Sequence, residues 1–348
     1  MLEHGGRLLE AARRHGIEAA RWLDLSTGIN PHAYPVGPIS AEAWRRLPEA
    51  EDGLGDVARR YYGVGGQQLD HLAIVPIAGT QAAIQALPRV LTRLHGSDQP
   101  LRVSVATLTY NEYAHAWQRA GHVVSTHDFS RLAEATAQAD IVMLCQPNNP
   151  TGEHLSSESL HAMLASLRSR SGVLIVDEAY MDATPDGSLL RSLGAPDWEH
   201  VIVLRSVGKF FGLAGARAGF ALGHPRIMQS LREELGPWAL SGPTRAAVAQ
   251  ALGDGAWQTR TRSAMHAMAA KLDVVLNQGL DVVPTGTSLF RWIEHPRSAA
   301  LHAHLASAAI LVRQFAAPTT GGLPSLRFGL PANHQQLARL DAALETFK

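Results

Sequence analysis

Short apolar runs alternate along most of this chain with segments whose apolar residues repeat at helical spacing. The runs cover residues 72–77, 103–106, 141–145, 173–176, 201–204 and 218–222. Between two of these runs we expect a helix that begins behind the capping residues Ser156 and Ser157, with apolar positions at Leu160, Met163, Leu164 and Leu167. The alternation predicts strand–helix–strand units and therefore a mostly parallel sheet in an α/β fold.

The pattern changes after residue 240. A long alanine-rich helical stretch comes first, followed by apolar runs at residues 280–283, 288–293 and 310–315 and by a last helical segment. This predicts a second, smaller unit that contains both helices and strands. Because a chain of 348 residues can bury a large core, we expect it to form two domains.

Composition narrows the classes of partner. Lysine plus arginine and aspartate plus glutamate number 31 each, so neither sign dominates and nothing favours nucleic acid or an anionic membrane. We expect a small-molecule partner. The single cysteine, Cys145, cannot form an intrachain disulfide, and no apolar stretch has the length of a signal region or a membrane span. These features favour a cytoplasmic protein.

Seventeen histidines raise the question of a metal site. None of them stands in a His-Glu-x-x-His or paired-cysteine arrangement. His302 and His304 are two residues apart on an expected helix, so their side chains point in different directions. We therefore predict no metal. A GxGxxG fingerprint is also absent, which argues against a dinucleotide-binding fold.

The most informative segment surrounds Lys209. Small residues flank the lysine, Ser206 comes three positions before it and Arg217 eight positions after it. A neutral amine in such a place can form a Schiff base with an aldehyde, and the hydroxyl and guanidinium can hold a phosphate. Taken alone, a lysine in a glycine-rich segment is more often a solvated loop residue.

A second segment, Gly79-Thr80-Gln81, follows the apolar run at 72–77 and opens a segment with helical composition. The backbone N–H groups and the positive end of a helix would meet a phosphate there. The alternative is an ordinary turn between a strand and a helix.

Polar side chains also follow three of the other predicted strands. Tyr110 comes after 103–106, Asn149 lies in a Pro-rich loop after 141–145, and Asp177 and Tyr180 come at the end of 173–176. Ligands bind at the carboxyl edge of open α/β sheets, so these side chains are candidates for one site. The alternatives are packing for the tyrosine, a generic Asn-Pro turn, and a helix cap for the aspartate.

These five segments, in this order, resemble the signature of the fold-type I enzymes that depend on pyridoxal 5′-phosphate (PLP). The resemblance implies that Lys209 carries the cofactor covalently. It also implies that Asp177 faces the ring nitrogen, where an ionised carboxylate keeps the pyridine protonated. The remaining roles implied are phosphate binding by Gly79, Thr80, Gln81, Ser206 and Arg217, stacking by Tyr110, and hydrogen bonds to the phenolic oxygen from Asn149 and Tyr180.

The family resemblance also implies a domain division. Residues 1–40 would form an amino-terminal arm that joins the smaller domain. Residues 41–240 would form the large PLP-binding domain, and residues 241–348 the small carboxy-terminal domain.

Two arginines of the expected small domain point to the substrate. Arg327, in Ser-Leu-Arg-Phe-Gly, matches the arginine that binds a substrate α-carboxylate in aminotransferase families, where a planar fork suits a planar anion. Arg313 matches an arginine that contacts the substrate phosphate in histidinol-phosphate aminotransferases. Two such sites imply a substrate with two anionic groups. The alternative, for Arg313 above all, is an ordinary surface arginine.

The amino-terminal arm is more specific. The segments His4-Gly5-Gly6 and 22–31 resemble the start of the threonine-phosphate decarboxylases of cobalamin biosynthesis, close relatives of the histidinol-phosphate aminotransferases. By this resemblance His4 and Asn30 lie near the substrate. The implied reaction is decarboxylation of O-phospho-L-threonine to (R)-1-amino-2-propanol O-2-phosphate, the aminopropanol linker unit.

Two other functions remain open from the sequence. A histidinol-phosphate-type aminotransferase would use the same residues but break the Cα–H bond, and it would require a 2-oxo acid. A PLP-fold protein acting as a scaffold or sensor is the other possibility, and the intact set of Asp177, Tyr180 and Lys209 argues against it.

One position departs from the family pattern. Histidinol-phosphate aminotransferases carry a Tyr-Pro-Asp segment whose tyrosine reaches the cofactor phosphate of the neighbouring subunit, whereas Leu47-Pro48-Glu49 stands here. Leu47 cannot donate that hydrogen bond. The homodimer with shared active sites is therefore an expectation taken from the family alone.

Overall fold

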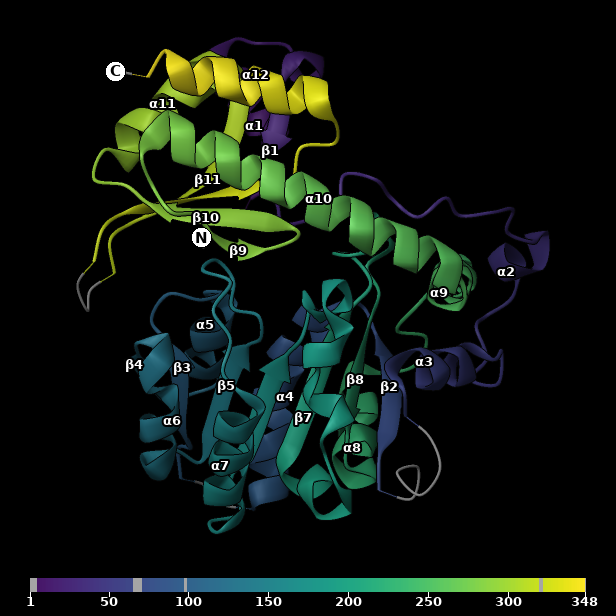
Figure 1. Ribbon diagram of the computed structural model, residues 1–348. Coiled ribbons are helices and arrows are strands. Elements are labelled where there is room, and N and C mark those ends of the chain that lie inside the picture. Colours follow the sequence, from purple (N-terminus) through teal and green to yellow (C-terminus); the bar gives the residue numbers. More distant parts are fainter. Residues whose placement is uncertain (1–4, 65–70, 97–98, 319–321, 348) are drawn as a thin grey trace.

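Two sheets organise the chain. A computed structural model describes residues 5–64, 71–96, 99–318 and 322–347. The larger sheet has seven strands in the order β2-β8-β7-β6-β5-β3-β4. Their bounds are β2 (Ala73–Ile77), β3 (Arg102–Ala106), β4 (Val123–His127), β5 (Ile141–Cys145), β6 (Val173–Asp177), β7 (Val201–Ser206) and β8 (Gly219–Gly223). Figure 1 shows this sheet below the smaller one.

The large sheet is mostly parallel, which confirms the predicted α/β fold. Strands β3 to β7 pair in parallel, and β8 lies antiparallel between β7 and β2. Every residue of β5, β6 and β7 is buried, as expected for strands that helices cover on both faces. All six predicted strands are present. The sequence prediction missed the edge strand β4, whose residues are exposed or half-buried and carry no apolar run.

Two groups of helices flank this sheet. Helix α4 (Thr80–His95) packs against α5 (Glu112–Arg119) and α8 (Pro225–Leu235), and α6 (Leu132–Ala135) packs against α7 (Ser157–Arg168). The Oγ of Ser156 accepts a hydrogen bond from the N–H of Ser159 at 3.1 Å, so this residue caps α7 as predicted. The other α-helices in the described part of the chain are α1 (Leu8–His15), α2 (Ala41–Arg45), α3 (Leu54–Tyr62), α9 (Gly242–Gly253), α10 (Gly255–Leu280), α11 (Ser298–Ser307) and α12 (His334–Glu345).

The smaller sheet joins the two ends of the chain. Its order is β1 (Leu23–Leu25), β11 (Ile310–Phe315), β12 (Ser325–Gly329), β10 (Phe290–Glu294) and β9 (Thr285–Thr287). The arm supplies β1, which pairs in parallel with β11. The predicted strand at 280–283 is wrong. Helix α10 continues to Leu280, Asp281 ends it with a left-handed backbone (φ 53°), and β9 starts only at Thr285.

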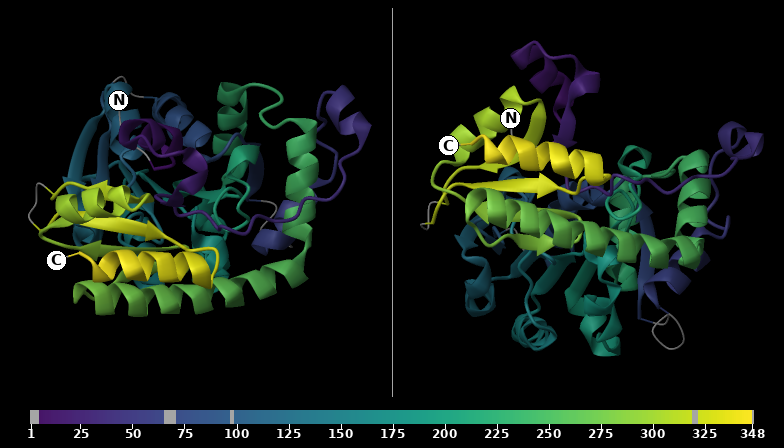
Figure 2. Two further views of the ribbon diagram at one scale, coloured as in Figure 1. Left: turned by 90° about the horizontal axis from the view of Figure 1, so that it is seen from above. Right: turned by 45° about the horizontal axis from the view of Figure 1, so that its top comes forward.

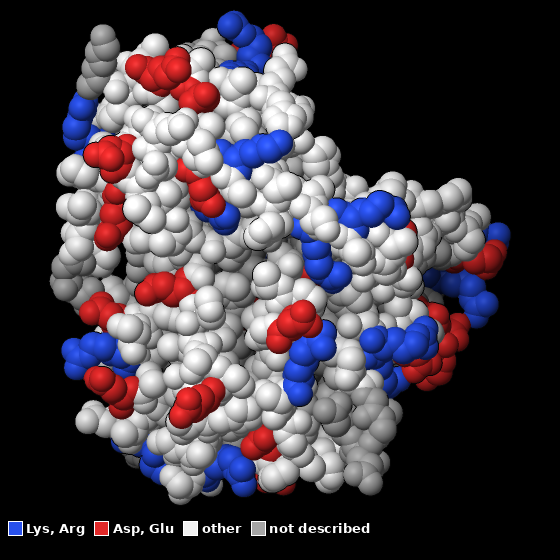
Figure 3. All heavy atoms as spheres, viewed as in Figure 1, with Lys and Arg blue, Asp and Glu red and all other residues white. Residues whose placement is uncertain are grey.

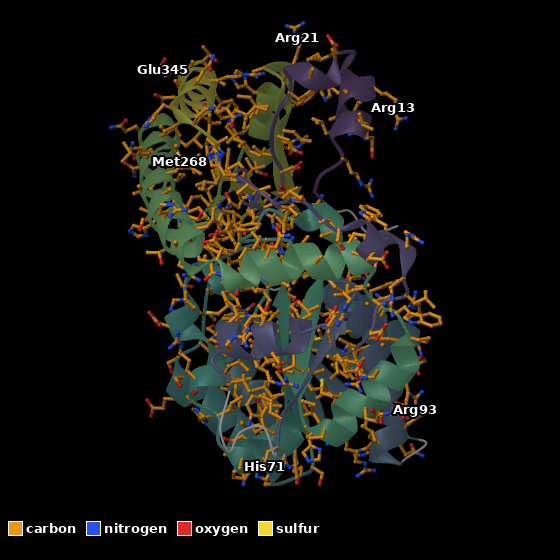
Figure 4. All side chains as sticks on the ribbon, turned by 90° about the vertical axis from the view of Figure 1, so that its right-hand side faces the viewer. Arg13, Arg21, His71, Arg93, Met268 and Glu345 are labelled. Atoms are coloured by element: carbon orange, nitrogen blue, oxygen red, sulfur yellow. The ribbon has the colours of Figure 1, made fainter. Side chains whose placement is uncertain are left out.

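Helix α10 spans both cores. Met265 and Ala269 belong to the core of the large sheet, whereas Leu272 and Leu276 belong to that of the small sheet. Met268, labelled in Figure 4, packs against both. Figure 2 shows α10 running beside α12 and reaching the region of α9 and α2. The division at residue 240 therefore stays a prediction, because the helices that follow it also pack on the large domain.

The structure also bears on the disulfide, the charged surface, the metal site and the membrane span that the sequence analysis considered. Cys145 is buried and forms no disulfide. On the face shown in Figure 3, basic and acidic side chains are interspersed. Over the described ranges, no group of three or more His, Cys, Asp and Glu side chains is placed to hold a metal ion. None of the helices in the described part of the chain combines the length and the apolarity that crossing a bilayer requires.

Candidate active site

The segments that carry the predicted site residues meet at one edge of the large sheet. Strands β3, β5, β6 and β7 are parallel, so their carboxyl ends lie at the same edge. Strand β2 runs antiparallel to β8, which in turn runs antiparallel to β7, so β2 also ends there and β8 begins there. The five segments that follow or precede these ends are the five found in the sequence. The sheet topology therefore brings them together although they span residues 79–217.

A cradle for an anion forms where α4 begins. Gly79 precedes the helix with a positive φ of 75°, and the first-turn N–H groups of α4 have no carbonyl partner within the helix. A Cβ added at Gly79 would lie 2.9 Å from Nη2 of Arg217. Ser206 pairs with Gly219 across β7 and β8, and a Cβ on Gly219 would lie 3.4 Å from the N of Thr80. A hydroxyl, a guanidinium and a helix end therefore surround one space.

Asp177 ends β6 in a fully buried position. Its Oδ2 accepts a hydrogen bond from the hydroxyl of Tyr113 at 2.9 Å, and its Oδ1 accepts one from the N–H of Ala179 at 3.0 Å. Burial raises the pKa of this carboxyl to about 6, although the two hydrogen bonds and the positive charge of Lys209 lower it. The acid is thus poised to ionise near neutral pH, and a cationic neighbour would complete its ionisation.

Lys209 faces a cavity of about 210 Å³ between the two sheets. Its Nζ lies 5.5 Å from the ring centre of Tyr180, which also lines the cavity. Six of the predicted site residues contribute to the lining, namely Tyr110, Asn149, Tyr180, Lys209, Arg313 and Arg327. The amine therefore meets the substrate-side residues in one space.

Tyr110 is held at the cavity by the start of α4. Its hydroxyl donates to Oε1 of Gln81 at 3.0 Å, and Nε2 of Gln81 donates to Oε2 of Glu112 at 2.8 Å. Burial raises the pKa of Tyr110, so the phenol stays protonated. The side chain of Gln81 is thus engaged with Tyr110, and the contact predicted for it with a phosphate can come from its backbone N–H.

Arg327 ties the two halves of the site together. Its Nη1 donates to Oδ1 of Asn149, and its Nη2 donates to the carbonyl oxygen of Ser26 at 2.8 Å. Its Nε is buried without a hydrogen-bond partner in the described structure. Burial lowers the pKa of this guanidinium, but an arginine remains a cation in a protein. A buried cation with a vacant donor indicates an anionic ligand.

Arg313 stands directly opposite Arg327. The two residues form a cross-strand pair between β11 and β12, and both line the cavity. Like charges placed opposite each other in a sheet repel and destabilise the pair. A ligand with two anionic groups would relieve this repulsion; that these arginines bind such a ligand stays a prediction.

The arm closes the cavity. Thr27, Gly28 and Ile29 line it, and a Cβ on Gly28 would lie 2.9 Å from the ring of Phe290 and 3.3 Å from the hydroxyl of Tyr180. Gly5 also lines it, and the N–H of Gly6 donates to Oγ of Ser26 at 2.8 Å. The predicted substrate residue His4 lies outside the described residues.

Asn30 is buried beside the cavity and does not line it. Its Nδ2 donates to the carbonyl oxygen of Phe210 at 2.9 Å, and its Oδ1 accepts from the N–H of His32 at 2.9 Å. Its own N–H donates to the carbonyl oxygen of Lys209 at 3.0 Å. Asn30 therefore fixes the arm to the lysine segment, while the substrate contact predicted for it stays a prediction.

Several lining residues were not predicted. They are Gly5, Thr27, Gly28, Ile29, Thr109, Asn111 and Phe315. Three of them stand in the arm segment 22–31, whose likeness to known enzymes was visible, but the sequence does not show which of its residues turn toward the cavity. Tyr113, the donor to Asp177, also escaped prediction because it occupies an ordinary apolar position of a helix.

Comparisons with known proteins place these features in a family. Residues 46–347 match the family model described as aminotransferase class I and II. The chain is 46% identical to a threonine-phosphate decarboxylase of Pseudomonas aeruginosa over 348 residues, which cover 100% of this chain and 98% of the relative. It is 38% identical to a second one, from a Sinorhizobium species, over 98% of this chain and 97% of the relative. Among solved structures, a histidinol-phosphate aminotransferase from Sinorhizobium meliloti in complex with pyridoxal-5′-phosphate superposes with a TM-score of 0.76 at 20% identity, covering 99% of this chain and 97% of that one.

Proposed function

The chain belongs to the family of class I and II aminotransferases, and on that premise we propose that it binds PLP and decarboxylates O-phospho-L-threonine. Two observations of different kinds support this. The relatives that match over the whole length are named threonine-phosphate decarboxylases. The cavity presents a lysine amine together with two arginines that face each other. Arg313 and Arg327 as a cross-strand pair are the single observation that carries the choice of a dianionic substrate.

The residues present fit the cofactor. The cradle at the start of α4 combines a helix end, the Ser206 hydroxyl and the Arg217 guanidinium, which suits a phosphate. It has no room for a Cβ at Gly79, where a side chain would collide with that guanidinium. Lys209 would hold the cofactor covalently, and Asp177 would face its ring nitrogen. The family's phosphate, ring and aldehyde contacts thus all have a matching group at this sheet edge.

PLP supplies an electron sink that stabilises the carbanion left when a bond to the substrate Cα breaks. The protein would decide which bond that is, because the residues that clamp the substrate set its orientation toward the cofactor. Arg327 is buried, is fixed by Asn149 and Ser26, and carries a vacant donor, so it is suited to clamp the carboxylate. Arg313, on the neighbouring strand, is then placed to receive the phosphate.

A proton must replace the lost carboxylate. Lys209 and Tyr180 are the groups with transferable protons that line the cavity beside each other, with Nζ 5.5 Å from the phenol ring centre. We assign the delivery of this proton to Lys209, assisted by Tyr180. The arm residues Thr27, Gly28 and Ile29 cover the cavity and limit the access of water.

The decisive experiment supplies O-phospho-L-threonine to the PLP-loaded protein without any 2-oxo acid. We expect carbon dioxide and 1-amino-2-propanol O-2-phosphate in equal amounts, the product that would serve as the aminopropanol linker of cobalamin. No release of carbon dioxide, together with turnover of histidinol phosphate in the presence of 2-oxoglutarate, would replace this function with the aminotransferase. L-threonine without its phosphate is the matched control substrate, and we expect it to react far more slowly.

We further propose that the enzyme works as a homodimer in the cytoplasm. Large apolar side chains are exposed at one end of the molecule, namely Trp44, Leu47 and Trp238. Trp44 lies on α2, which packs against α9, and Ala43 approaches Gly242 closely, so the loop that carries Trp238 adjoins α2. A second copy of this chain would cover these side chains. Light scattering of the wild type and of Trp44→Ser tests this, since a wild-type monomer would contradict it.

A further inference from the structure

Tyr113 is a buried phenol next to the catalytic machinery that the proposed function does not use. It lies on α5 with a relative exposure of 1%, and its hydroxyl donates to Oδ2 of Asp177 at 2.9 Å. The two residues are 64 positions apart in the sequence, so only the packing of α5 on the sheet creates this contact. It does not line the cavity, and therefore it acts on a ligand through its neighbours, of which Asp177 is the one that accepts its hydrogen bond.

The carboxylate of Asp177 accepts hydrogen bonds from the protein and still has lone pairs for another donor. Each carboxylate oxygen accepts one bond from the protein, Oδ2 from Tyr113 and Oδ1 from the N–H of Ala179. A carboxylate has further lone pairs on both oxygens. The protein thus fixes the plane of the carboxylate with two neutral donors and leaves lone pairs on both oxygens for a further donor.

The surroundings of the hydrogen bond between Tyr113 and Asp177 keep its proton on the phenol of Tyr113. Burial, followed by the charge of Asp177, raises the pKa of Tyr113 well above its ordinary value, so the phenol keeps its proton. The other titratable groups that interact with Asp177 are Lys209, Glu178, Cys145 and Tyr110. Burial raises the pKa of the Cys145 thiol, which donates to the carbonyl oxygen of Pro147 at 3.1 Å and stays neutral.

We infer that Tyr113 is a positioning residue that holds Asp177 ionised and aimed at the ring nitrogen of the cofactor. The inference rests on the proposed function only for the identity of that cofactor. Without the phenol, the buried carboxylate would lose a donor that stabilises its charged form, and its pKa, already raised to about 6 by burial, would rise further. Less of it would be ionised at neutral pH.

The placement of Tyr113 also links Asp177 to Tyr110, the side chain predicted to stack on the cofactor ring. Tyr110 and Tyr113 stand one turn apart at the start of α5, where the N–H of Tyr113 donates to the carbonyl oxygen of Tyr110 at 3.0 Å. Their rings meet edge to face with centroids 5.4 Å apart. The same turn therefore positions the aromatic side chain at the cavity and the donor to the buried acid.

The first test observes Asp177 itself in the full-length, cofactor-free protein. Carbon-13 at the aspartate side-chain carboxyl carbon is followed by NMR from pH 4 to 9, and the Asp177 signal is identified by its loss in Asp177→Asn. We expect Tyr113→Phe to raise the pH midpoint of this signal by about one unit. The ring of phenylalanine preserves the packing, so the midpoint reports on the hydroxyl alone. An unchanged midpoint in a folded Tyr113→Phe protein would overturn the inference.

The second test measures cofactor affinity as a function of pH by the quenching of tryptophan fluorescence. At neutral pH we expect Tyr113→Phe to bind PLP only about twofold more weakly, and the loss should grow toward about tenfold as the pH falls below the wild-type midpoint of Asp177, because a shift of one pKa unit changes the ionised fraction of Asp177 by these factors. In the Asp177→Asn background the same substitution should change nothing further. An equal loss at every pH, or in both backgrounds, would mean that Tyr113 acts only in packing.

Tyr62→Phe is the matched control. Tyr62 is also buried in the core of the large sheet, and its hydroxyl has no hydrogen-bond partner in the described structure. We expect this variant to leave the Asp177 midpoint and the pH profile of cofactor affinity unchanged. A wild-type protein that does not bind PLP would refute the proposed function, while the NMR midpoint would still decide the role of Tyr113.

Discussion

The two halves of the active site are built in different ways. The half on the large sheet consists of short segments that each adjoin a buried strand, and Asp177 and Ser206 are themselves the last residues of β6 and β7. The half on the small sheet consists of the arm and of β11 and β12, which come from opposite ends of the chain. It holds its shape through single contacts such as the bond from Arg327 to the carbonyl oxygen of Ser26.

This difference separates the residues expected to carry out the reaction from those expected to select the substrate. A group at the end of a buried parallel strand is placed by the whole sheet, so its position is insensitive to single substitutions elsewhere. The substrate side depends on a few side chains, among them Asn30, which joins the arm to the lysine segment at Phe210 and Lys209. We therefore expect substitutions in the first half to abolish reaction and those in the second to change which substrate reacts.

Lys209→Ala should have the largest effect. It removes the amine that would hold the cofactor and return the proton, so we expect turnover of O-phospho-L-threonine to fall by at least about 10³-fold. The visible absorption of the covalently bound cofactor should disappear as well. Lys271→Ala is the control, because Lys271 is exposed on α10 and its Nζ lies 3.1 Å from Nε2 of His334 rather than at the cavity. Comparable activity in Lys209→Ala and Lys271→Ala would contradict the view that the large-sheet half of the active site carries out the reaction.

Arg327→Gln should have the next largest effect, confined to the substrate. Losing a buried, charge-assisted clamp on a carboxylate should lower kcat/KM by about 10²-fold or more. We expect the absorption spectrum of the bound cofactor to persist, because the cradle at the start of α4 is untouched. Arg327→Lys keeps the charge but not the planar fork and should recover only part of the loss. Loss of the cofactor in both variants would show that the two halves are not separable.

The sequence specified the large-sheet half well. Each predicted cofactor residue adjoins a strand whose apolar run was visible, and the parallel pairing of β3 to β7 brings the strand ends together. The fold is confirmed, whereas the roles of the individual residues stay predictions. Local pattern was sufficient here because a strand buried on both faces leaves a continuous apolar run, and the polar residue that ends the run marks the sheet edge.

The sequence specified the other half less well, for three physical reasons. Strand β1 has three residues, too few for a periodic signal. The run at 280–283 was assigned to a strand because so short a run does not distinguish a strand from the end of a helix, and α10 continues to Leu280. Tyr113 meets Asp177 only through tertiary packing, which no local pattern encodes.

Gly152→Ala tests the contact between the two halves of the active site. Gly152 has a φ of 78°, and a Cβ there would lie on the backbone of Gly286, 2.7 Å from its carbonyl oxygen. Nearby, Oγ1 of Thr285 donates to the carbonyl oxygen of Thr151 at 3.0 Å. We expect the substitution to lower the free energy of unfolding by about 2–3 kcal/mol, from backbone strain and from the collision.

The effect of Gly152→Ala is measured by denaturant unfolding and by kcat/KM. We expect kcat/KM to fall too, because Asn149 lies in the same loop and accepts a hydrogen bond from Arg327. Gly253→Ala is the matched control, since that glycine ends helix α9 and a Cβ there meets nothing within 4 Å. Its stability should stay the same or rise slightly. If Gly152→Ala were as stable as this control, the two halves would not meet as closely as described.

Asp140→Asn should have the smallest effect, at the edge of the large sheet opposite the site. Asp140 accepts hydrogen bonds from the N–H of Arg102 at 2.9 Å and from its Nη2 at 2.6 Å, and these bonds to Arg102 lower the pKa of the carboxyl. A folded-state pKa below the unfolded value means that the pair stabilises the protein above the unfolded pKa, and that this contribution is lost as the pH falls through the folded pKa. Arg102 is exposed to solvent and Asp140 is half-buried, so screening by water is substantial and we expect a loss of only about 0.5–1 kcal/mol at pH 7. The unfolding free energies of the wild type and Asp140→Asn should converge in acid, and their kcat/KM values should agree at neutral pH. A change in kcat/KM would mean that the large sheet does transmit distant substitutions to its carboxyl edge, which is the one behaviour that the rigid half is expected not to show.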